Sequence, residues 1–125
     1  MAYNNFCKIF VDTSMGYQGF VILISDFING TITFLGEIES NALSISVIKN
    51  KDFDGELKNR PESGSFVYYQ YYLEVEPSEG VDYQTFVKQV KALVDFLRSK
   101  GFRTIAACDF EDELNDGKPA TEFMK

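Results

Sequence analysis

The amino-acid sequence predicts a single α+β domain, in which two amphipathic helices cover one face of a mainly antiparallel sheet. Three observations carry this prediction. The chain has 125 residues, a common size for one domain. Several short segments alternate apolar and polar residues, which is typical of half-buried strands. Two longer segments place apolar residues three and four positions apart, which is typical of helices packed on a core.

Residues 15–28 decide how many helices the sheet carries, because this segment has two interpretations. As a helix, its large apolar side chains share one face, Thr13 or Ser14 caps its start, and Asn29-Gly30 ends it in the left-handed conformation. As a strand, it would bury a polar residue on each face, and Asn29-Gly30 would form a hairpin turn. We favour the helix.

The second helix has clearer boundaries. Asp82 is a typical N-cap residue, and Val81 and Phe86 are placed around it as a hydrophobic staple. Apolar side chains then recur with the helical period as far as Leu97, and Gly101 ends the helix.

Five strands are predicted from alternating or short apolar runs bounded by turn residues. They lie at residues 6–12, 31–40, 42–50, 66–77 and 102–110, and the second strand bends at Gly36. One long polar loop, residues 50–65, precedes the fourth strand.

The element order is therefore β-α-β-β-β-α-β, which favours a two-layer sandwich with both helices on one face. A ferredoxin-like split βαβ unit with one additional strand is an arrangement of this kind. We expect one α+β domain over residues 1–125, with a frayed tail over residues 115–125.

The composition excludes several kinds of chemistry. The chain contains no histidine, so it lacks the commonest general base, Ser-His and Cys-His nucleophile pairs, and imidazole metal ligands. We predict no catalytic residue, metal site or cofactor. The net charge is −7, from 12 basic and 19 acidic residues, which opposes binding to nucleic acids or anionic membranes and favours a basic partner.

The two cysteines indicate the compartment. Cys7 and Cys108 are far apart in the sequence and lie in apolar, strand-like segments, so we expect buried thiols and not a disulfide. Acidic residues follow Cys108, whereas a reactive thiol needs an electropositive surrounding. The sequence shows no secretion signal and no apolar run long enough to span a membrane, so we predict a cytoplasmic protein.

The first candidate site is the acidic run ACDFEDELND after the last predicted strand. Its carboxylates are those of Asp109, Glu111, Asp112, Glu113 and Asp116, with no basic residue among them. A solvated strand exit, a protein-binding patch and a site for Mg²⁺ or Ca²⁺ are all compatible with this composition, although the run lacks the ligand spacing of an EF-hand.

The second candidate site is the aromatic strand FVYYQYYLEVEP. One predicted face belongs to the core and carries Val67, Tyr69, Tyr71, Leu73 and Val75. The other face carries Phe66, Tyr68, Gln70, Tyr72, Glu74 and Glu76. Exposed tyrosines beside carboxylates would suit a basic protein, because tyrosine supplies contact area at a low entropic cost. The long loop could instead cover this face. The candidate binding residues here are Tyr68, Tyr72 and Glu74.

Three segments, VIKNKDFD, YYLEVEP and AACDFEDEL, resemble small uncharacterised bacterial α+β proteins of about this length. The resemblance spans most of residues 43–114 and departs from the pattern at Asn115, where proline is expected. It implies an α+β fold and a bacterial cytosolic origin, and it brings no activity or ligand.

These observations lead to three functional hypotheses. The leading one is a cytosolic protein-binding module, similar in size and charge to immunity proteins that neutralise basic toxins, which would use the acidic run and the tyrosine-rich face. The second is a small carboxylate- or metal-dependent enzyme that uses Asp109, Glu111 and Glu113. The third is a homodimer joined through the exposed aromatic face.

Overall fold

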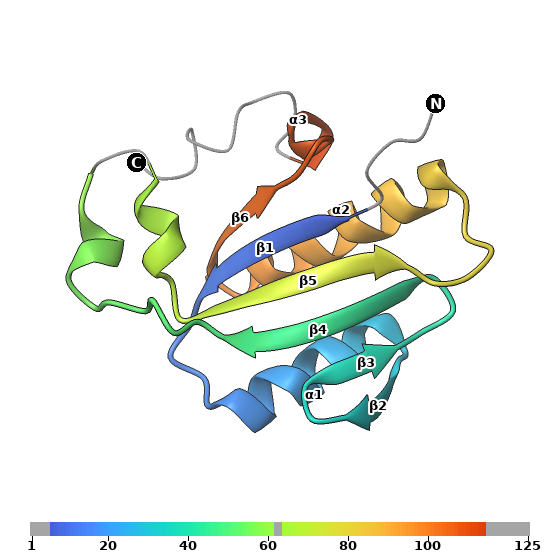
Figure 1. The fold of residues 1–125 in the computed structure, drawn as a ribbon, viewed down its shortest axis with the longest axis horizontal. Coiled ribbons are helices and arrows are strands. Elements are labelled where there is room, and N and C mark those ends of the chain that lie inside the picture. The colour runs from blue at the N-terminus through green and yellow to red at the C-terminus, as the bar shows by residue number, and fades with distance from the viewer. Residues whose placement is uncertain (1–5, 62–63, 115–125) are drawn as a thin grey trace.

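The computed structural model describes residues 6–61 and 64–114, and these residues form one sheet with helices behind it (Figure 1). The strands are β1 (Cys7–Asp12), β2 (Thr31–Phe34), β3 (Glu37–Glu39), β4 (Leu43–Lys49), β5 (Tyr71–Pro77) and β6 (Arg103–Ala107). The long helices are α1 (Tyr17–Ile28) and α2 (Tyr83–Ser99). The short helices are the 3₁₀ turns η1 (Leu57–Asn59) and η2 (Ser65–Tyr68), and α3 (Glu111–Leu114).

The predicted frayed tail, residues 115–125, lies outside the described residues. Within the described ranges, no helix combines the length and the apolar character that a membrane crossing requires.

All six strands belong to one antiparallel sheet with the order β2-β3-β4-β5-β1-β6. The four strands β4-β5-β1-β6, with α1 between β1 and β4 in the chain and α2 between β5 and β6, form a ferredoxin-like split βαβ unit. The β2–β3 hairpin extends this unit beyond β4. The predicted α+β sandwich is confirmed, with six strands where about five were expected.

The sixth strand comes from residues 31–40, which were predicted as one bent strand. The chain reverses at Leu35-Gly36, and β2 pairs back on β3. Gly36 permits the reversal because its φ is 71° and because a Cβ at this position would collide with the Tyr17 hydroxyl. That hydroxyl donates a 2.6 Å hydrogen bond to the Val47 carbonyl, which ties α1 to this corner of the sheet.

Asn29-Gly30 ends a helix, as the sequence predicts. Asn29 adopts the left-handed conformation with a φ of 53°, and the Gly30 amide donates a 2.9 Å hydrogen bond to the Ser25 carbonyl. This six-to-one bond is typical of a Schellman end. The polar Ser25 side chain is buried on the helix, and its hydroxyl is satisfied by the Gly30 carbonyl at 2.9 Å.

The predicted start of α1 is wrong by about half a turn. Neither Thr13 nor Ser14 caps the helix; the N-cap is Gly16, which has no side chain to donate or accept. The Thr13 hydroxyl oxygen instead accepts a 3.1 Å hydrogen bond from the Met15 amide, which stabilises a turn before the helix begins.

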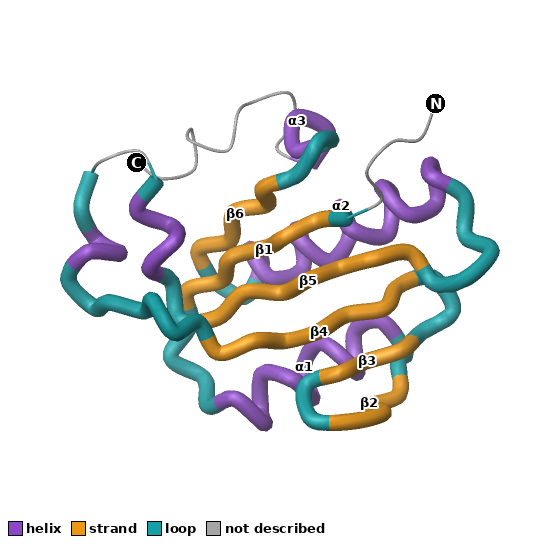
Figure 2. The backbone as a smooth tube through the Cα atoms, viewed as in Figure 1, coloured by secondary structure: helices purple, strands orange, loops and turns teal. Residues whose placement is uncertain are grey.

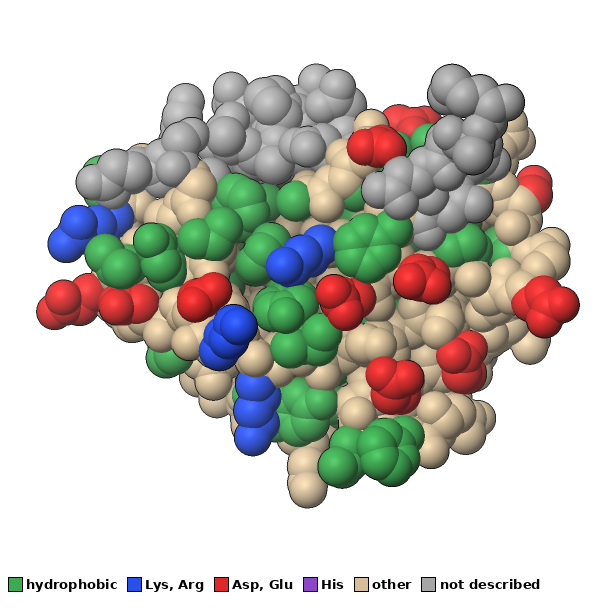
Figure 3. Space-filling model, in the orientation of Figure 1, with side chains coloured by type: hydrophobic (Ala, Val, Ile, Leu, Met, Phe, Trp, Pro, Cys, Tyr) green, Lys and Arg blue, Asp and Glu red, His purple; other side chains and the backbone are tan. Residues whose placement is uncertain are grey.

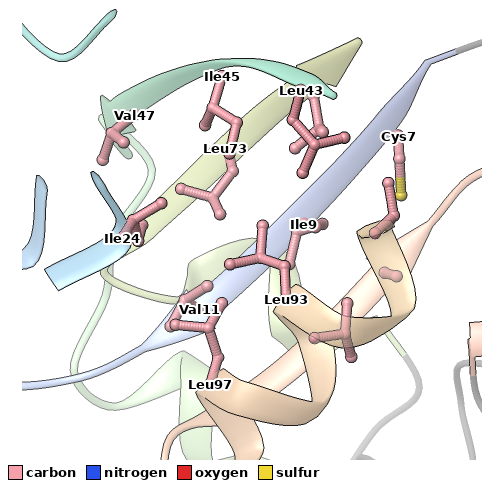
Figure 4. Close-up of a cluster of buried hydrophobic side chains, with 14 of the residues drawn as sticks. Cys7, Ile9, Val11, Ile24, Leu43, Ile45, Val47, Leu73, Leu93 and Leu97 are labelled. Carbon is pink, nitrogen blue, oxygen red and sulfur yellow. The ribbon is translucent and has the colours of Figure 1, made fainter. Parts of the chain in front are cut away.

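Both long helices lie across the same face of the sheet, here the inner face, so the core is one layer between sheet and helices (Figure 2). The strands contribute alternate residues to it, among them Cys7, Ile9, Val11, Leu43, Ile45, Val47, Tyr71, Leu73 and Val75. The helices contribute Phe20, Val21, Ile24, Phe86, Val90, Leu93 and Leu97. Figure 4 shows Ile24 of α1 and Leu93 and Leu97 of α2 directed toward the strand side chains. A fully buried Val, Leu, Ile or Phe side chain stabilises the fold by roughly 1.5–3 kcal/mol.

The aromatic strand is shorter than predicted, because β5 starts at Tyr71 and residues 65–68 form η2 instead. The alternation therefore fails before Tyr71. Val67 was expected in the core and is 38% exposed. Tyr69 is buried, but it packs against Phe10 and Ile105 on the outer face, opposite the helices.

Asn50 gives the physical reason for this shift. Its side-chain amide donates 2.8 Å hydrogen bonds to the carbonyls of Val67 and Tyr69. These two carbonyls are thereby satisfied outside the strand ladder, so Val67 and Tyr69 do not follow the alternation that β5 keeps from Tyr71 onward.

The boundaries of α2 agree with the prediction. The Asp82 carboxylate accepts a 3.2 Å hydrogen bond from the Thr85 amide, and hydrogen bonds from Thr85 lower the pKa of this carboxyl. At the other end, Gly101 has a φ of 83° and its amide donates to the Arg98 carbonyl at 2.9 Å.

Candidate functional site

The acidic run lies after β6, around the short helix α3. Asp109 and Glu113 are exposed. The side chains of Glu111 and Asp112, and the whole of Asp116, lie outside the described residues. The structure therefore places the run at a strand exit, where its described carboxylates face solvent.

Two apolar residues within the acidic run fix it to the domain. Phe110 and Leu114 are buried and join the main core, where Phe110 contacts the rings of Tyr83 and Phe86 edge-on. Among the described side chains, which leave out those of Glu111 and Asp112, no group of three or more His, Cys, Asp or Glu is placed to hold a metal ion.

The tyrosine-rich candidates separate in the structure. Tyr72 and Glu74 are half-buried neighbours on the outer face of β5. Tyr68 belongs to η2, before the strand begins, and so does not share the alternation of the other two. The acidic run is also separate from them, because β1 lies between β5 and β6.

Strand pairing instead brings Glu74 together with acidic residues that were not predicted as binding residues. Two cross-strand rows occupy the outer face of β3, β4 and β5, namely Glu37-Ser46-Glu74 and Glu39-Ser44-Glu76. The Ser46 hydroxyl donates to Glu37 at 2.9 Å, and the Ser44 hydroxyl donates to Glu39 at 2.6 Å. The four glutamates of these rows form what is named the glutamate patch below.

The rows explain how the sheet tolerates four carboxylates on one face. Like charges directly opposite each other destabilise a strand pair. Here a serine stands between the two glutamates of each row, so no two carboxylates are direct cross-strand neighbours. The alternation of EIE at residues 37–39 and of serines at 44 and 46 was visible in the sequence, but joining them required the strand order.

The glutamate patch forms no ion pair within the described part of the chain. Lys8 pairs with Glu74 through the backbone ladder, but its ammonium group lies 4.2 Å from the centre of the Tyr72 ring and 5.2 Å from that of Phe10. Figure 3 shows acidic side chains close together over this part of the sheet, with apolar side chains and a basic side chain beside them, and further acidic side chains at the left of the view.

The rest of the outer face is covered by the loop between β4 and β5. Phe10, Tyr69 and Ile105 form a small buried cluster there, with Phe66 and Tyr72 packed against it. This loop cover, residues 50–61 and 64–70, closes one end of the outer face and leaves the glutamate patch open at the other.

An ion-pair clamp holds the loop cover to β1. Asp12 accepts hydrogen bonds from Lys58 at 2.7 Å and from Arg103 at 2.5 Å. Burial raises the pKa of Asp12, but the hydrogen bonds from Lys58 and Arg103 outweigh it, so the pKa lies below its ordinary value. The Asp12 carboxylate therefore stays ionised and joins the loop, β1 and β6.

A second surface feature was missed by sequence reasoning. An apolar groove lies between α1 and the β2–β3 hairpin and is lined mainly by Tyr17, Val21, Ile22, Ile32, Phe34 and Leu35. Phe34 and Leu35 at its rim are 72% and 79% exposed, and β2 is an edge strand. Exposure there was not predicted, because the same residues in one continuous strand would have been half-buried.

The fold and these surfaces define the molecule as a small α+β domain with an open acidic sheet face and an apolar edge. Comparison of the chain with protein-family models, curated proteins and solved structures finds no match. The resemblance of three segments to small bacterial proteins therefore stays a prediction, and the geometry is the basis for any functional inference.

Proposed function

We propose that this protein is a protein-binding module that recognises a basic partner through the glutamate patch and the adjoining Tyr72. One observation carries the proposal: four carboxylates share a sheet face that no described segment covers, and no described lysine or arginine forms an ion pair with them. A face that carries charge without internal partners is complementary to a cationic surface.

The spacing of the patch suggests the form of the partner. Along one strand, alternate residues such as Glu37 and Glu39, or Glu74 and Glu76, are about 6.5–7 Å apart. An extended peptide repeats its side chains over the same distance. A segment with lysine or arginine at alternate positions would therefore match the carboxylates of either strand, and two such segments would occupy both.

Tyr72 adds an apolar contact to this charged surface. It lies on the same face as Glu74, at the boundary with the Phe10 cluster. Exposed ion pairs contribute little individually, roughly 0.2–1 kcal/mol each, so an aromatic side chain at the centre of a contact supplies much of the affinity. The carboxylates mainly raise the association rate and select a basic partner.

We further propose that the protein acts in a bacterial cytosol and that its partner is a basic toxin, which this domain neutralises. The acidic net charge of −7 and the small size of the domain support this role.

Two variants of equal net charge test the proposal. In the first, Glu37, Glu39, Glu74 and Glu76 are replaced by glutamine. In the control, four exposed acids outside the patch are neutralised instead: Asp26→Asn, Asp52→Asn, Glu56→Gln and Glu79→Gln. Calorimetry measures binding of a synthetic peptide with lysine at alternate positions, at low and high salt, and a pull-down from bacterial lysate is run in parallel.

We expect the wild type and the control variant to bind the peptide alike, with an affinity that falls as salt increases. The patch variant should lose at least about tenfold in affinity, because it loses every carboxylate of the surface. Equal weakening in both variants would mean that net charge alone drives binding, and salt-insensitive binding would exclude an ionic surface.

The apolar groove supports a second candidate function, a homodimer. β2 is an edge strand whose four residues are all exposed, and the groove beside it is lined by uncharged residues. Two copies that each carry a charge of −7 repel one another over most of their surface, so this uncharged edge is where they can meet. Antiparallel pairing of β2 with β2 about a two-fold axis would seat each Phe34 against the other copy.

Sedimentation at several concentrations tests this dimer. The wild type should pass from monomer to dimer as concentration increases, and Phe34→Glu should stay monomeric, because a carboxylate would be buried in the contact. Gln84→Glu, at an exposed position on α2 away from β2, is a matched control for added charge. A wild type that is monomeric at every concentration would remove this candidate.

A further inference from the structure

Cys7 and Cys108 are 101 positions apart in the sequence and adjacent in the fold. Their Sγ atoms are 2.8 Å apart. The pairing of β1 with β6 explains this proximity, because Lys8 faces Ala107 and Ile9 faces Ala106. Continued by one residue, the same register places Cys7 opposite Cys108.

The strand geometry suits a covalent link between the two thiols. Directly opposite residues in an antiparallel pair have Cα atoms about 4.5–5.5 Å apart. Disulfides span Cα distances of about 4.4–6.8 Å. Both side chains point to the inner face, and closing the gap between the sulfur atoms needs side-chain rotation without movement of either strand.

The two thiols differ in access to solvent. Cys7 is completely buried, whereas Cys108 is half-buried at the end of β6. A reagent in solution therefore reaches Cys108 first, and Cys7 is positioned behind it to react with whatever forms there.

We propose that Cys7 and Cys108 form a dithiol modification site, which a low-molecular-weight disulfide oxidises to an intramolecular disulfide. The Cys108 thiolate attacks one sulfur of the reagent, forms a mixed disulfide and releases the first reagent thiol. Cys7 then attacks the Cys108 sulfur and releases the second reagent thiol. The protein loses two electrons and two protons, and the reagent gains both.

The disulfide would change the C-terminal edge of the sheet. It would fasten β6, an edge strand with one neighbour, to β1 at the point where the acidic run begins. A cross-link between such distant residues also restricts the unfolded chain strongly, so oxidation should raise the melting temperature by at least about 5 °C.

Oxidised glutathione is the probe that tests this site. With the folded wild type, the count of free thiols should fall from two to none, the mass should fall by two hydrogens, and no glutathione should remain attached. Dithiothreitol should reverse the change and the gain in melting temperature. Thiol titration, intact mass spectrometry and thermal unfolding provide the three measurements.

Two variants separate the roles of the thiols. Cys7→Ala should accumulate a stable glutathione adduct on Cys108, because no second thiol resolves it. Cys108→Ala should react slowly, at least about tenfold below Cys7→Ala, because its remaining thiol is buried. Circular dichroism confirms that each variant is folded. A wild type that keeps the adduct, links two chains or retains both thiols in excess reagent would overturn the proposal.

Discussion

The two ends of the outer sheet face differ in whether another segment of the chain covers them. At the end near Phe10, the strands carry aromatic and aliphatic side chains, and the loop cover shields them from water. At the other end the strands carry the glutamate patch, and no described segment covers it. The comparison teaches that this sheet face is covered where burial is favourable and left open where charge makes burial costly.

The largest change in stability is expected when the Tyr69 ring is removed from the centre of the covered end. Tyr69 is 1% exposed, so Tyr69→Ala should lower the free energy of unfolding by roughly 3–5 kcal/mol, as for other buried aromatic residues. Tyr72→Ala, at the boundary with the open end, should lower it by less than about 1.5 kcal/mol. Urea unfolding of both variants makes the comparison, and equal losses would show that the loop does not shield one end more than the other.

A smaller loss of stability is expected when Asn50, which positions the loop cover, is truncated. Asn50→Ala removes the two 2.8 Å hydrogen bonds to the carbonyls of Val67 and Tyr69. Leaving the buried Tyr69 carbonyl and the partly buried Val67 carbonyl without this donor should lower the free energy of unfolding by roughly 1–3 kcal/mol. Asn41→Ala, an exposed control, should stay within about 0.5 kcal/mol of the wild type. In Asn50→Ala, hydrogen exchange should be faster at the Asp54 amide, because this amide donates to the Tyr68 carbonyl in the segment that Asn50 holds.

The clamp at Asp12 should make the covered end sensitive to acid. Its pKa is lowered in the folded protein, so its contribution to stability is present above the unfolded value, about 3.9, and is lost as pH falls through the folded pKa. Asp12→Asn should therefore be less stable than the wild type by about 1 kcal/mol at neutral pH. The difference should shrink below about pH 4. A difference that is constant from neutral pH to about pH 2 would contradict this assignment.

The smallest effect is expected at the open end. Replacement of the four patch glutamates by glutamine should leave the free energy of unfolding within about 1 kcal/mol of the wild type, or raise it slightly, because the carboxylates repel one another. Urea unfolding at low salt checks this. A large loss would indicate that the patch is structural and would weaken the binding proposal directly.

The sequence predicted those parts of the fold that depend on local patterns. Asn29-Gly30 predicted the end of α1, and Asp82 with the apolar period predicted α2, because caps and helical faces involve residues close in the chain. The hairpin at Leu35-Gly36 was missed, because apolar residues on both sides of the turn resemble one continuous strand. Tyr69 was assigned to the wrong face, because hydrogen bonds from the distant Asn50 shift the phase before β5.

The candidate sites were also predictable where they depend on one strand, and not where they depend on which strands pair. Tyr72 and Glu74 were found from the alternation within one strand and do share a face. Glu37 and Glu39 joined them only through the register of β3 on β4 and of β4 on β5. The proximity of Cys7 and Cys108 likewise depends on β1 lying beside β6, which no single segment reveals.

The position of β1 between β5 and β6 also sets the order in which the chain can fold. β1 precedes every other element in the sequence, yet its neighbours are residues 71–77 and 103–107. On the ribosome it must wait unpaired while the β2–β3–β4 meander forms from neighbouring residues. Pairing between residues so far apart in the sequence slows folding. We therefore expect the sheet to be completed late, after most of the chain has left the ribosome.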